Sequence, residues 1–208
     1  MLTDKEVGFV IQARLGSTRL PAKALLYYRG TTILGYIIQS LLDCGISPNL
    51  ICVATSTSRL DDALNFYLTE IGCQVFRGSE DNVFSRYQGV AIETGFKNMV
   101  RLTGDNPSIN TELLMHCVKL HLRNKSALTT TRKIEGTKVI RYVPKGLSVD
   151  VINSDFMLSI DNTSLNKFEM EHVIPIFFKK SNVQLVKDFR VSTSDSSIDT
   201  LDDYVRLF

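Results

Sequence analysis

The first two-thirds of the chain alternates short runs of β-branched and apolar residues with longer segments of helical periodicity. The short runs are expected to be buried strands, at Val7–Ile11, Leu50–Ala54, Val75–Phe76 and Met99–Leu102. The longer segments predict helices at Ile33–Cys44, Leu60–Ile71, Val83–Thr94 and Thr111–Arg123. This alternation requires right-handed crossovers, which leave successive strands parallel. The sequence therefore predicts a three-layer, Rossmann-like α/β fold with a mostly parallel central sheet.

The pattern changes after about residue 126. Three strand candidates follow closely, at Ala127–Thr131, Lys138–Val143 and Ser148–Val151, and predict an antiparallel excursion on the same sheet. The remaining elements are expected to be helices at Ser154–Ile160, Lys167–Lys179 and from Thr200 onward, with a strand at Gln184–Val186. No repeat or linker divides the 208 residues, so we expect a single domain over residues 1–208.

Composition excludes several classes of protein. The net charge of +2 provides no basic field of the kind that nucleic-acid binders carry. The four cysteines have neither zinc-site nor redox-motif spacing, which is typical of free thiols in a reducing compartment. No segment approaches the ~20 apolar residues that cross a bilayer, and the N-terminal apolar run is too short for a secretory signal. We therefore expect a cytoplasmic protein without nucleic-acid or membrane partners.

A basic loop follows the first predicted strand directly. It reads Ala13-Arg14-Leu15-Gly16-Ser17-Thr18-Arg19-Leu20-Pro21-Ala22-Lys23. Ligands bind beyond the carboxyl ends of the strands in such sheets, and Arg and Lys at that edge form an anion site. Backbone N–H groups around Gly16 and Ser17 add a nest of donors, and a triphosphate is the anion that fits best. The alternative is a solvated surface loop that is basic by chance, although that alternative predicts no particular spacing.

Six stretches, taken in order, resemble the CMP-sugar synthetases. The basic loop is similar to their R-x-G-S-x-R-x-P-x-K signature. The others are Val53–Ser56, Phe76–Tyr87, Arg101–Pro107, the pair Gly146–Val151 and Glu171–Pro175, and Asp199–Asp203. The resemblance is closest to the spore-coat polysaccharide and acylneuraminate branch, with the ketodeoxyoctonate enzymes related. It implies the nucleotide-diphospho-sugar transferase fold, a homodimer, and transfer of CMP from CTP to a sugar with release of pyrophosphate.

The resemblance also implies site residues. It assigns catalytic roles to Arg14, Lys23 and Asp105. It assigns CTP binding to Ala13, Arg14, Gly16, Ser17, Arg19, Lys23, Thr55, Arg77, Ser79 and Asp105. On the sugar side it implies Asp150, Glu171 and His172. Arg86, two turns into a predicted helix, is left open between this pocket and solvent. Ala22 stands where the family commonly has Gly, and Ser148 and Asp150 stand where relatives often have Asp and Glu.

Two aspartates are candidate magnesium ligands. Asp105 follows a predicted central strand and lies between Gly104 and Pro107, and Asn110 or Thr111 is better placed to cap the next helix. Magnesium prefers one or two carboxylates, water and substrate phosphate oxygens, so Asp105 suits it. Asp199 taken alone is a helix N-cap. Only the resemblance makes it the second ligand.

The chemistry leaves alternatives open. In the favoured reaction a hydroxyl of a sialic-, legionaminic-, pseudaminic- or ketodeoxyoctonate-type acid attacks the α-phosphorus of CTP. The closest rival is a nucleotidyltransferase for a sugar phosphate or polyol phosphate. A non-catalytic nucleotide-binding homologue is a different class, and the intact set of charged residues argues against it. If Asp105 and Asp199 share one Mg²⁺ with the triphosphate, we expect their carboxylates within roughly 8 Å of each other.

Replacement of the loop lysine tests the phosphate interpretation. We expect Lys23→Ala to lower turnover at least tenfold, about 1.4 kcal/mol of barrier, because it removes a charge from the phosphate site. Steady-state kinetics measure the loss, and circular dichroism checks that the variant is folded. Normal turnover with unchanged CTP affinity would show that the loop is only a surface feature.

Overall fold

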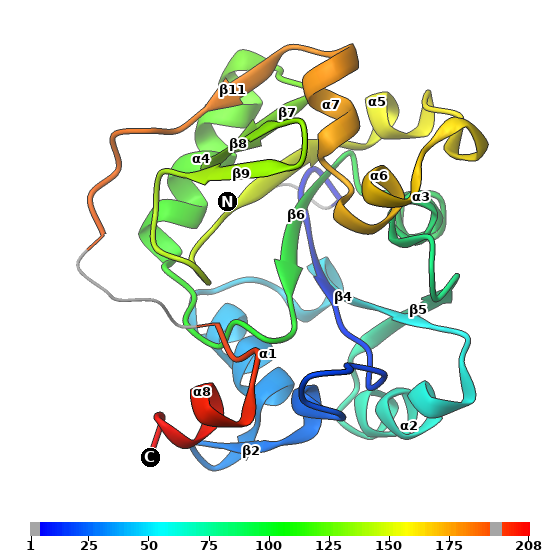
Figure 1. The fold of residues 1–208 in the computed structure, drawn as a ribbon, viewed down its shortest axis with the longest axis vertical. Coiled ribbons are helices and arrows are strands. Elements are labelled where there is room, and N and C mark those ends of the chain that lie inside the picture. The colour runs from blue at the N-terminus through cyan, green and yellow to red at the C-terminus, as the bar shows by residue number, and fades with distance from the viewer. Residues whose placement is uncertain (1–4, 192–196) are drawn as a thin grey trace.

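The computed structural model describes residues 5–191 and 197–208 and contains a seven-stranded sheet (Figure 1). The strands run in the order β11-β7-β10-β6-β1-β4-β5. Their bounds are β1 Gly8–Gln12, β4 Ile51–Ser56, β5 Gln74–Gly78, β6 Asn98–Thr103, β7 Leu128–Thr130, β10 Asp150–Asn153 and β11 Val183–Leu185. Only β10 is antiparallel to its neighbours. The predicted α/β fold with a mostly parallel sheet is confirmed.

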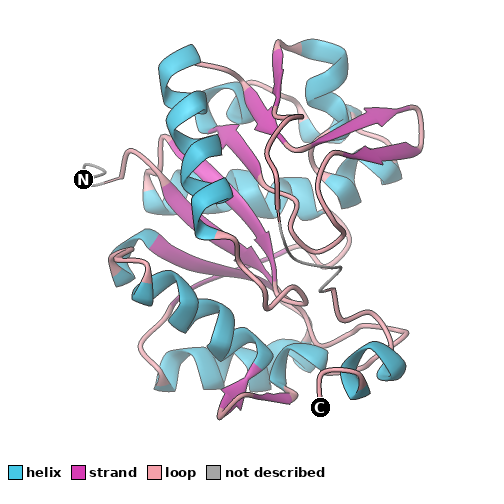
Figure 2. Cartoon of the chain, turned by 90° about the vertical axis from the view of Figure 1, so that its left-hand side faces the viewer, coloured by secondary structure: helices cyan, strands magenta, loops and turns pink. Residues whose placement is uncertain are grey.

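Helices flank the sheet (Figure 2). They are α1 Ile33–Asp43, α2 Asp62–Glu70, α3 Val83–Thr94, α4 Thr111–Asn124, α5 Ser154–Leu158, α6 Lys167–His172, α7 Pro175–Lys180 and α8 Leu201–Val205. Helix α3 packs on β4 and β5 and also contacts α5 and α6, whereas α4 packs on β7 and β10. The short strands β2 (Tyr27–Tyr28) and β3 (Thr31–Thr32) form a separate ribbon that the sequence did not predict. Among the described residues, no helix has the length and apolar character needed to span a bilayer.

The antiparallel excursion differs from its prediction. Strands β8 (Arg132–Glu135) and β9 (Lys138–Arg141) pair only with each other and form a hairpin outside the main sheet. Residues 138–143 were expected within the sheet, but β9 carries exposed charges at both of its ends. A strand in the middle of a sheet covered by helices has its side chains buried. The charged hairpin therefore projects from the sheet, and only β10 joins it.

The predicted helix at Lys167–Lys179 is two helices. It breaks between α6 and α7, where Val173 has a φ of 66° and Pro175 begins the second helix. Proline has no backbone N–H to donate to the preceding turn, so Pro175 begins a new helix and does not continue α6. A β-branched residue rarely adopts positive φ, but the side chain of Val173 is fully buried, which holds it there. This break ends α6 just after Glu171 and His172.

A buried histidine joins α4 to the sheet. His121 is 1% exposed, and its Nδ1 and Nε2 lie 3.0 Å from Thr129 Oγ1 and Asn98 Oδ1. Because the Asn98 amide oxygen can only accept, Nε2 carries the proton and Nδ1 accepts from the Thr129 hydroxyl. Burial lowers the pKa of His121 to about 4. The folded protein therefore holds this imidazole neutral.

Acid should destabilise the fold through His121. The neutral ring favours the native state above the unfolded pKa of about 6.5, and this contribution is lost as the pH falls toward 4. Denaturant titrations from pH 7.5 to 4.5 should show a loss of up to about 3 kcal/mol in the free energy of unfolding that His121→Asn lacks. His116→Asn, on the exposed side of the same helix, is the matched control, and its free energy of unfolding should change with pH as that of the wild type does. Equal slopes in the wild type and His121→Asn would contradict the prediction.

Candidate active site

A buried carboxylate, that of Asp61, fixes the backbone of the basic loop after β1. Asp61 is 1% exposed and accepts from the Leu15 backbone N–H (2.7 Å) and, with its other oxygen, from the N–H (3.1 Å) and hydroxyl of Ser56. Ala22 closes the loop with its N–H donating to Leu15 O (2.9 Å) and has a φ of 56°. Glycine adopts this left-handed conformation more easily than alanine does. Asp61 had no role in the sequence analysis, because its partners lie on two other segments.

A close backbone approach brings the loop after β6 against the loop after β1. The Gly104 N–H donates to Gln12 O (2.9 Å), and a Cβ added at Gly104 would lie 2.9 Å from the Ala13 Cβ. Only glycine allows the two loops to come this close. Asp105, the next residue, therefore faces the basic loop.

Lys23 joins the two predicted metal ligands. Its Nζ lies 2.5 Å from Asp105 Oδ2 and 3.7 Å from Asp199 Oδ1, and it donates to Ile198 O (3.0 Å). Because one ammonium group contacts both carboxylates, they lie closer together than the roughly 8 Å expected for a shared ion. That spatial prediction is confirmed, although a shared metal remains a prediction.

Neither aspartate caps a helix. The N-cap of α4 is Asn110, as predicted, and the N-cap of α8 is Thr200, which forms a capping box with Asp203. The Asp199 carboxylate instead contacts Arg19 (2.8 Å) and Lys145 (2.6 Å). Partial burial acts to raise the pKa of Asp199, but Lys145, Lys23 and Arg19 outweigh it and hold that pKa below its usual range. The interpretation of Asp199 as a cap is therefore wrong.

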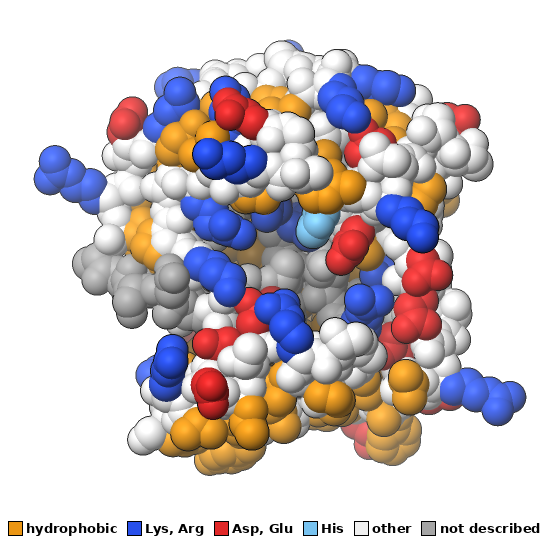
Figure 3. All heavy atoms as spheres, in the orientation of Figure 1, with side chains coloured by type: hydrophobic (Ala, Val, Ile, Leu, Met, Phe, Trp, Pro, Cys, Tyr) orange, Lys and Arg blue, Asp and Glu red, His pale blue; other side chains and the backbone are white. Residues whose placement is uncertain are grey.

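Two cavities meet at Asp105. The first, which we call the loop cavity, has a volume of about 310 Å³. Its polar lining includes Gln12, Arg14, Ser17, Arg19, Lys23, Arg86, Asp105 and Glu171, and Ala13 lines it as well. The second, the arginine cavity, has a volume of about 190 Å³ and includes Arg101, Asp105, Arg132, Arg141, Lys145, Ser148 and Asp199 in its lining. Figure 3 shows a hollow in the face of the molecule with Lys and Arg side chains gathered around it.

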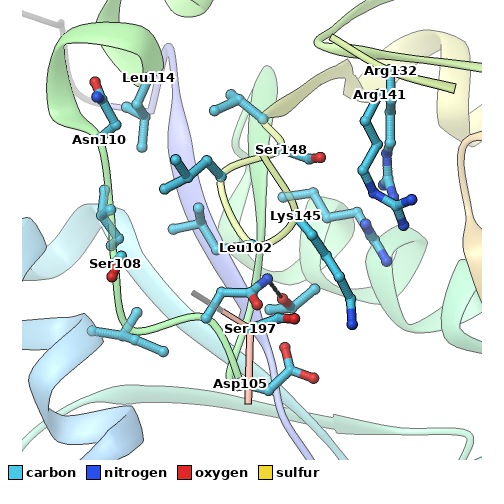
Figure 4. Close-up of a pocket in the computed structure, with 18 of the residues that line it drawn as sticks. Leu102, Asp105, Ser108, Asn110, Leu114, Arg132, Arg141, Lys145, Ser148 and Ser197 are labelled. Atoms are coloured by element: carbon cyan, nitrogen blue, oxygen red, sulfur yellow. Dashed lines mark hydrogen bonds between the residues drawn. The ribbon is translucent and has the colours of Figure 1, made fainter. Parts of the chain in front are cut away.

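The arginine cavity has a cationic wall from the β8–β9 hairpin. Arg132 and Arg141 are directly opposite each other across the two strands, and their side chains lie side by side along the cavity (Figure 4). Like charges in this cross-strand position repel each other. Lys145 extends into the same cavity toward Asp105 (Figure 4). The roles of these three cations could not be predicted from the sequence, because their convergence depends on how the hairpin folds over the sheet.

Asp150 lies behind this wall and does not line the cavity. It is 1% exposed, and its carboxylate accepts from Thr130 Oγ1 (2.7 Å), Arg101 Nη1 (3.2 Å) and the guanidinium of Arg132. Burial acts to raise the pKa of Asp150, but Arg132 and Arg101 hold it below its usual range. The predicted direct contact of Asp150 with a sugar is therefore corrected: this residue positions two arginines that line the cavity.

Several other predicted residues lie outside both cavities. Arg77 donates to Ser56 O and Ser58 O (both 2.9 Å) and pairs with Asp62 (2.8 Å), so its guanidinium ties the end of β4 to the start of α2. Thr55 is fully buried, and Ser79 Oγ accepts from the N–H of Asn82 (3.0 Å). Gly16 does not line the loop cavity either. Arg77 and Thr55 therefore support the fold at the end of β4 and line neither the loop cavity nor the arginine cavity.

The two predicted residues of α6 have different surroundings. Glu171 is exposed and lines the loop cavity. His172 lines neither cavity and packs against Phe168 with ring centroids 4.5 Å apart. Desolvation lowers the pKa of His172, the charge of Glu171 opposes this effect, and the charges of Arg101 and Arg132 lower the pKa further. His172 therefore lies within the electrostatic field of the arginine cavity without lining it.

The comparisons with known proteins agree over nearly the whole chain. Residues 9–200 match the family model described as Cytidylyltransferase. The chain is 30% identical over 210 residues to the spore coat polysaccharide biosynthesis protein SpsF of Bacillus subtilis, covering 96% of this chain and 83% of that protein. A cytidylyltransferase structure from Leptospira borgpetersenii has a TM-score of 0.83 at 30% identity and covers 96% of this chain and 83% of its own.

A more distant structure shares the fold. It is a CMP:2-keto-3-deoxy-manno-octonic acid synthetase complexed with CTP, with a TM-score of 0.71 at 14% identity, covering 97% of this chain and 96% of that one. The basic loop and Asp105, which follows β6, both lie within the residues that match the family model. This chain is therefore a member of the cytidylyltransferase family.

Proposed function

We propose that this protein transfers CMP from CTP to a hydroxyl of an acidic sugar, of the sialic, legionaminic, pseudaminic or ketodeoxyoctonate type, and releases pyrophosphate. The observation that carries the proposal is the meeting of two cation-lined cavities at one aspartate, Asp105. Each cavity is suited to an anion, and a reaction between two anionic substrates needs two such cavities side by side. Membership of the cytidylyltransferase family supports the identity of the first substrate.

The loop cavity suits the triphosphate. Arg14, Arg19 and Lys23 all line it. Arginine binds phosphate oxygens through two parallel N–H groups, and lysine provides a compact point charge on a flexible chain. The Asp61 anchor fixes the backbone of the loop before any ligand binds, so little ordering is required on binding. These residues supply charge and position, which account for most of the rate in phosphoryl transfer.

The arginine cavity suits an anionic acceptor. Asp150 contacts the Arg132 guanidinium, whereas Arg141 on the opposite strand has no ion-pair partner among the described residues. An anion bound beside Arg141 would therefore reduce the repulsion between the two like charges. A planar guanidinium matches a carboxylate with two parallel hydrogen bonds. In the proposed reaction the acceptor hydroxyl oxygen forms a bond to the α-phosphorus. The bond from that phosphorus to the bridging oxygen breaks, pyrophosphate departs with the electron pair, and the hydroxyl proton is released to water.

Magnesium fits the donors near Lys23. The part of the chain that the structure describes contains no group of three or more His, Cys, Asp or Glu side chains able to hold a metal by themselves. Asp105 and Asp199 both contact Lys23, and the buried Asn106 Oδ1 has no hydrogen-bond partner among the described residues. Mg²⁺ is usually held by one or two carboxylates, with water and phosphate oxygens as its other ligands, and not by protein ligands alone. When bound there by Asp105 and Asp199, the ion would offset negative charge on the phosphate oxygens.

A phosphate-bearing acceptor is the second candidate. The same arginines bind a phosphate as well as a carboxylate. The chain is also 24% identical, over 86% of its length, to a 2-C-methyl-D-erythritol 4-phosphate cytidylyltransferase of Clostridium botulinum. The homodimer and the cytoplasmic location implied by the resemblance stay predictions, and light scattering of the purified protein tests the first.

A turnover screen tests the proposal. Four nucleoside triphosphates are assayed against acidic sugars, neutral sugars, and sugar or polyol phosphates, with and without Mg²⁺, by measuring pyrophosphate release. We expect turnover with CTP, an acidic sugar and Mg²⁺, and little with ATP, GTP or UTP, because a pocket built for cytosine leaves polar groups unpaired with other bases. Turnover only with phosphorylated acceptors would favour the second candidate. Equal calorimetric affinity for all four nucleotides would remove the cytidylyl assignment.

Replacement of Asp150 tests its positioning role. Asp150→Asn keeps the acceptor for Thr130 but removes the charge between Arg101 and Arg132, and we expect a loss of about 3 kcal/mol in the free energy of unfolding. We also expect a raised KM for the acceptor and an unchanged KM for CTP, because Asp150 does not line the loop cavity. Asp81→Asn, at an exposed aspartate, is the control. Wild-type stability with an unchanged acceptor KM would show that Asp150 positions nothing.

A further inference from the structure

Arg86 is a buried cation without an ion-pair partner among the residues that the structure describes. It lies in the second turn of α3, is 3% exposed, and lines the loop cavity. Its Nε is buried without a hydrogen bond, and no residue of 5–191 or 197–208 forms an ion pair with its guanidinium. Removing a cation from water without a partner costs several kcal/mol. A side chain held at this cost points to a ligand.

The fold makes a specific place for this side chain. A Cβ added at Gly78 would lie 2.7 Å from Arg86 Cγ, so the arginine stem occupies the space above a glycine at the end of β5. Asn82 caps α3 with its side chain accepting from Ser85 N (2.9 Å), which fixes the first turn of the helix beneath Arg86. The guanidinium is therefore held at the edge of the loop cavity by packing and not by a salt bridge.

Nearby carboxylates act on Arg86 only at a distance, because none among the described residues forms an ion pair with it. Burial lowers the pKa of Arg86, the charge of Arg14 lowers it further, and Asp61 and Glu80 oppose both effects. Both Asp61 oxygens are already occupied by Leu15 and Ser56. Arg14 itself lines the same cavity and has no ion-pair partner among the described residues. Two unpaired guanidinium groups that face one cavity repel each other, and a negative group bound between them removes that repulsion.

We infer that Arg86 is a phosphate-binding residue that, together with Arg14, contacts a phosphoryl oxygen of the bound nucleotide. This inference rests on the proposed function, which places a triphosphate in the loop cavity. A neutral carbonyl of the base would accept a hydrogen bond from Arg86 but would leave the repulsion between the two cations in place. A phosphoryl group satisfies both requirements, because its oxygens accept from both guanidinium groups and its charge balances them.

Binding measurements on single variants test the inference. Arg86→Met keeps most of the buried stem and removes the charge, and Arg123→Met makes the same change at an exposed arginine of α4 as the matched control. Each protein is titrated with CTP, inorganic tripolyphosphate and cytidine. We expect Arg86→Met to bind CTP and tripolyphosphate about tenfold more weakly or worse, with cytidine affinity unchanged. Arg123→Met should match the wild type with all three ligands.

Thermal unfolding without ligand separates binding from a structural role. Loss of an unpaired buried cation should leave the melting temperature of Arg86→Met at or above that of the wild type. A lower melting temperature with undiminished tripolyphosphate affinity would overturn the inference, as would an equal loss of affinity for cytidine. If Arg86→Met does not fold, Arg86→Gln is judged by the same criteria. Wild-type protein that binds tripolyphosphate but shows no preference for CTP would defeat the proposed function, and the tripolyphosphate comparison would still decide the role of Arg86.

Discussion

The contact of Lys23 with Asp105 and Asp199 holds the functional edge of the sheet together. These residues come from three segments that are distant in sequence, and two carboxylates this close would repel each other without the ammonium group between them. Backbone bonds reinforce the contact, since Ile198 donates its N–H to Asp105 O and accepts from Lys23. The close approach at Gly104 makes the contact possible by bringing the β6 loop onto the β1 loop. Both cavities border on this cluster, so their shapes depend on it.

Two other buried carboxylates orient the groups around the cavities without lining the cavities themselves. Asp61 holds the backbone of the basic loop, and Asp150 holds Arg101 and Arg132. Neither lines a cavity, and each is almost completely buried. The cations on the cavity surfaces are thereby oriented while much of their charge remains available. Donors oriented before the ligand arrives need no reorganisation during reaction, which is the most effective form of electrostatic stabilisation.

The sequence predicted the main sheet more accurately than it predicted the hairpin and the helices α6 and α7. Strands β1 and β4 follow from continuous apolar runs, because they are buried along almost their whole length. Helices α1 and α4 follow from helical periodicity, because each has one buried face. Residues 138–143, which contain β9, were wrongly included in the sheet, and β8 was not predicted, because strands that pair with each other have the same local pattern as strands that join a sheet. The division between α6 and α7 was missed although Pro175 indicated it, and the buried Val173 fixes where the break occurs.

At the site, local spacing was enough for the groups that one loop presents. Arg14, Ser17, Arg19 and Lys23 line one cavity because a short loop after a buried strand has only one side open to solvent. Asp105 was identified for the same reason. The sequence could not show that Thr200 rather than Asp199 caps α8, that Asp150 faces inward, or that Arg86 is buried without an ion pair to any described residue. Each of these depends on which groups from distant segments come within hydrogen-bonding distance. Periodicity determines which side of an element is buried, whereas the charge a buried side chain meets is decided only when the layers pack.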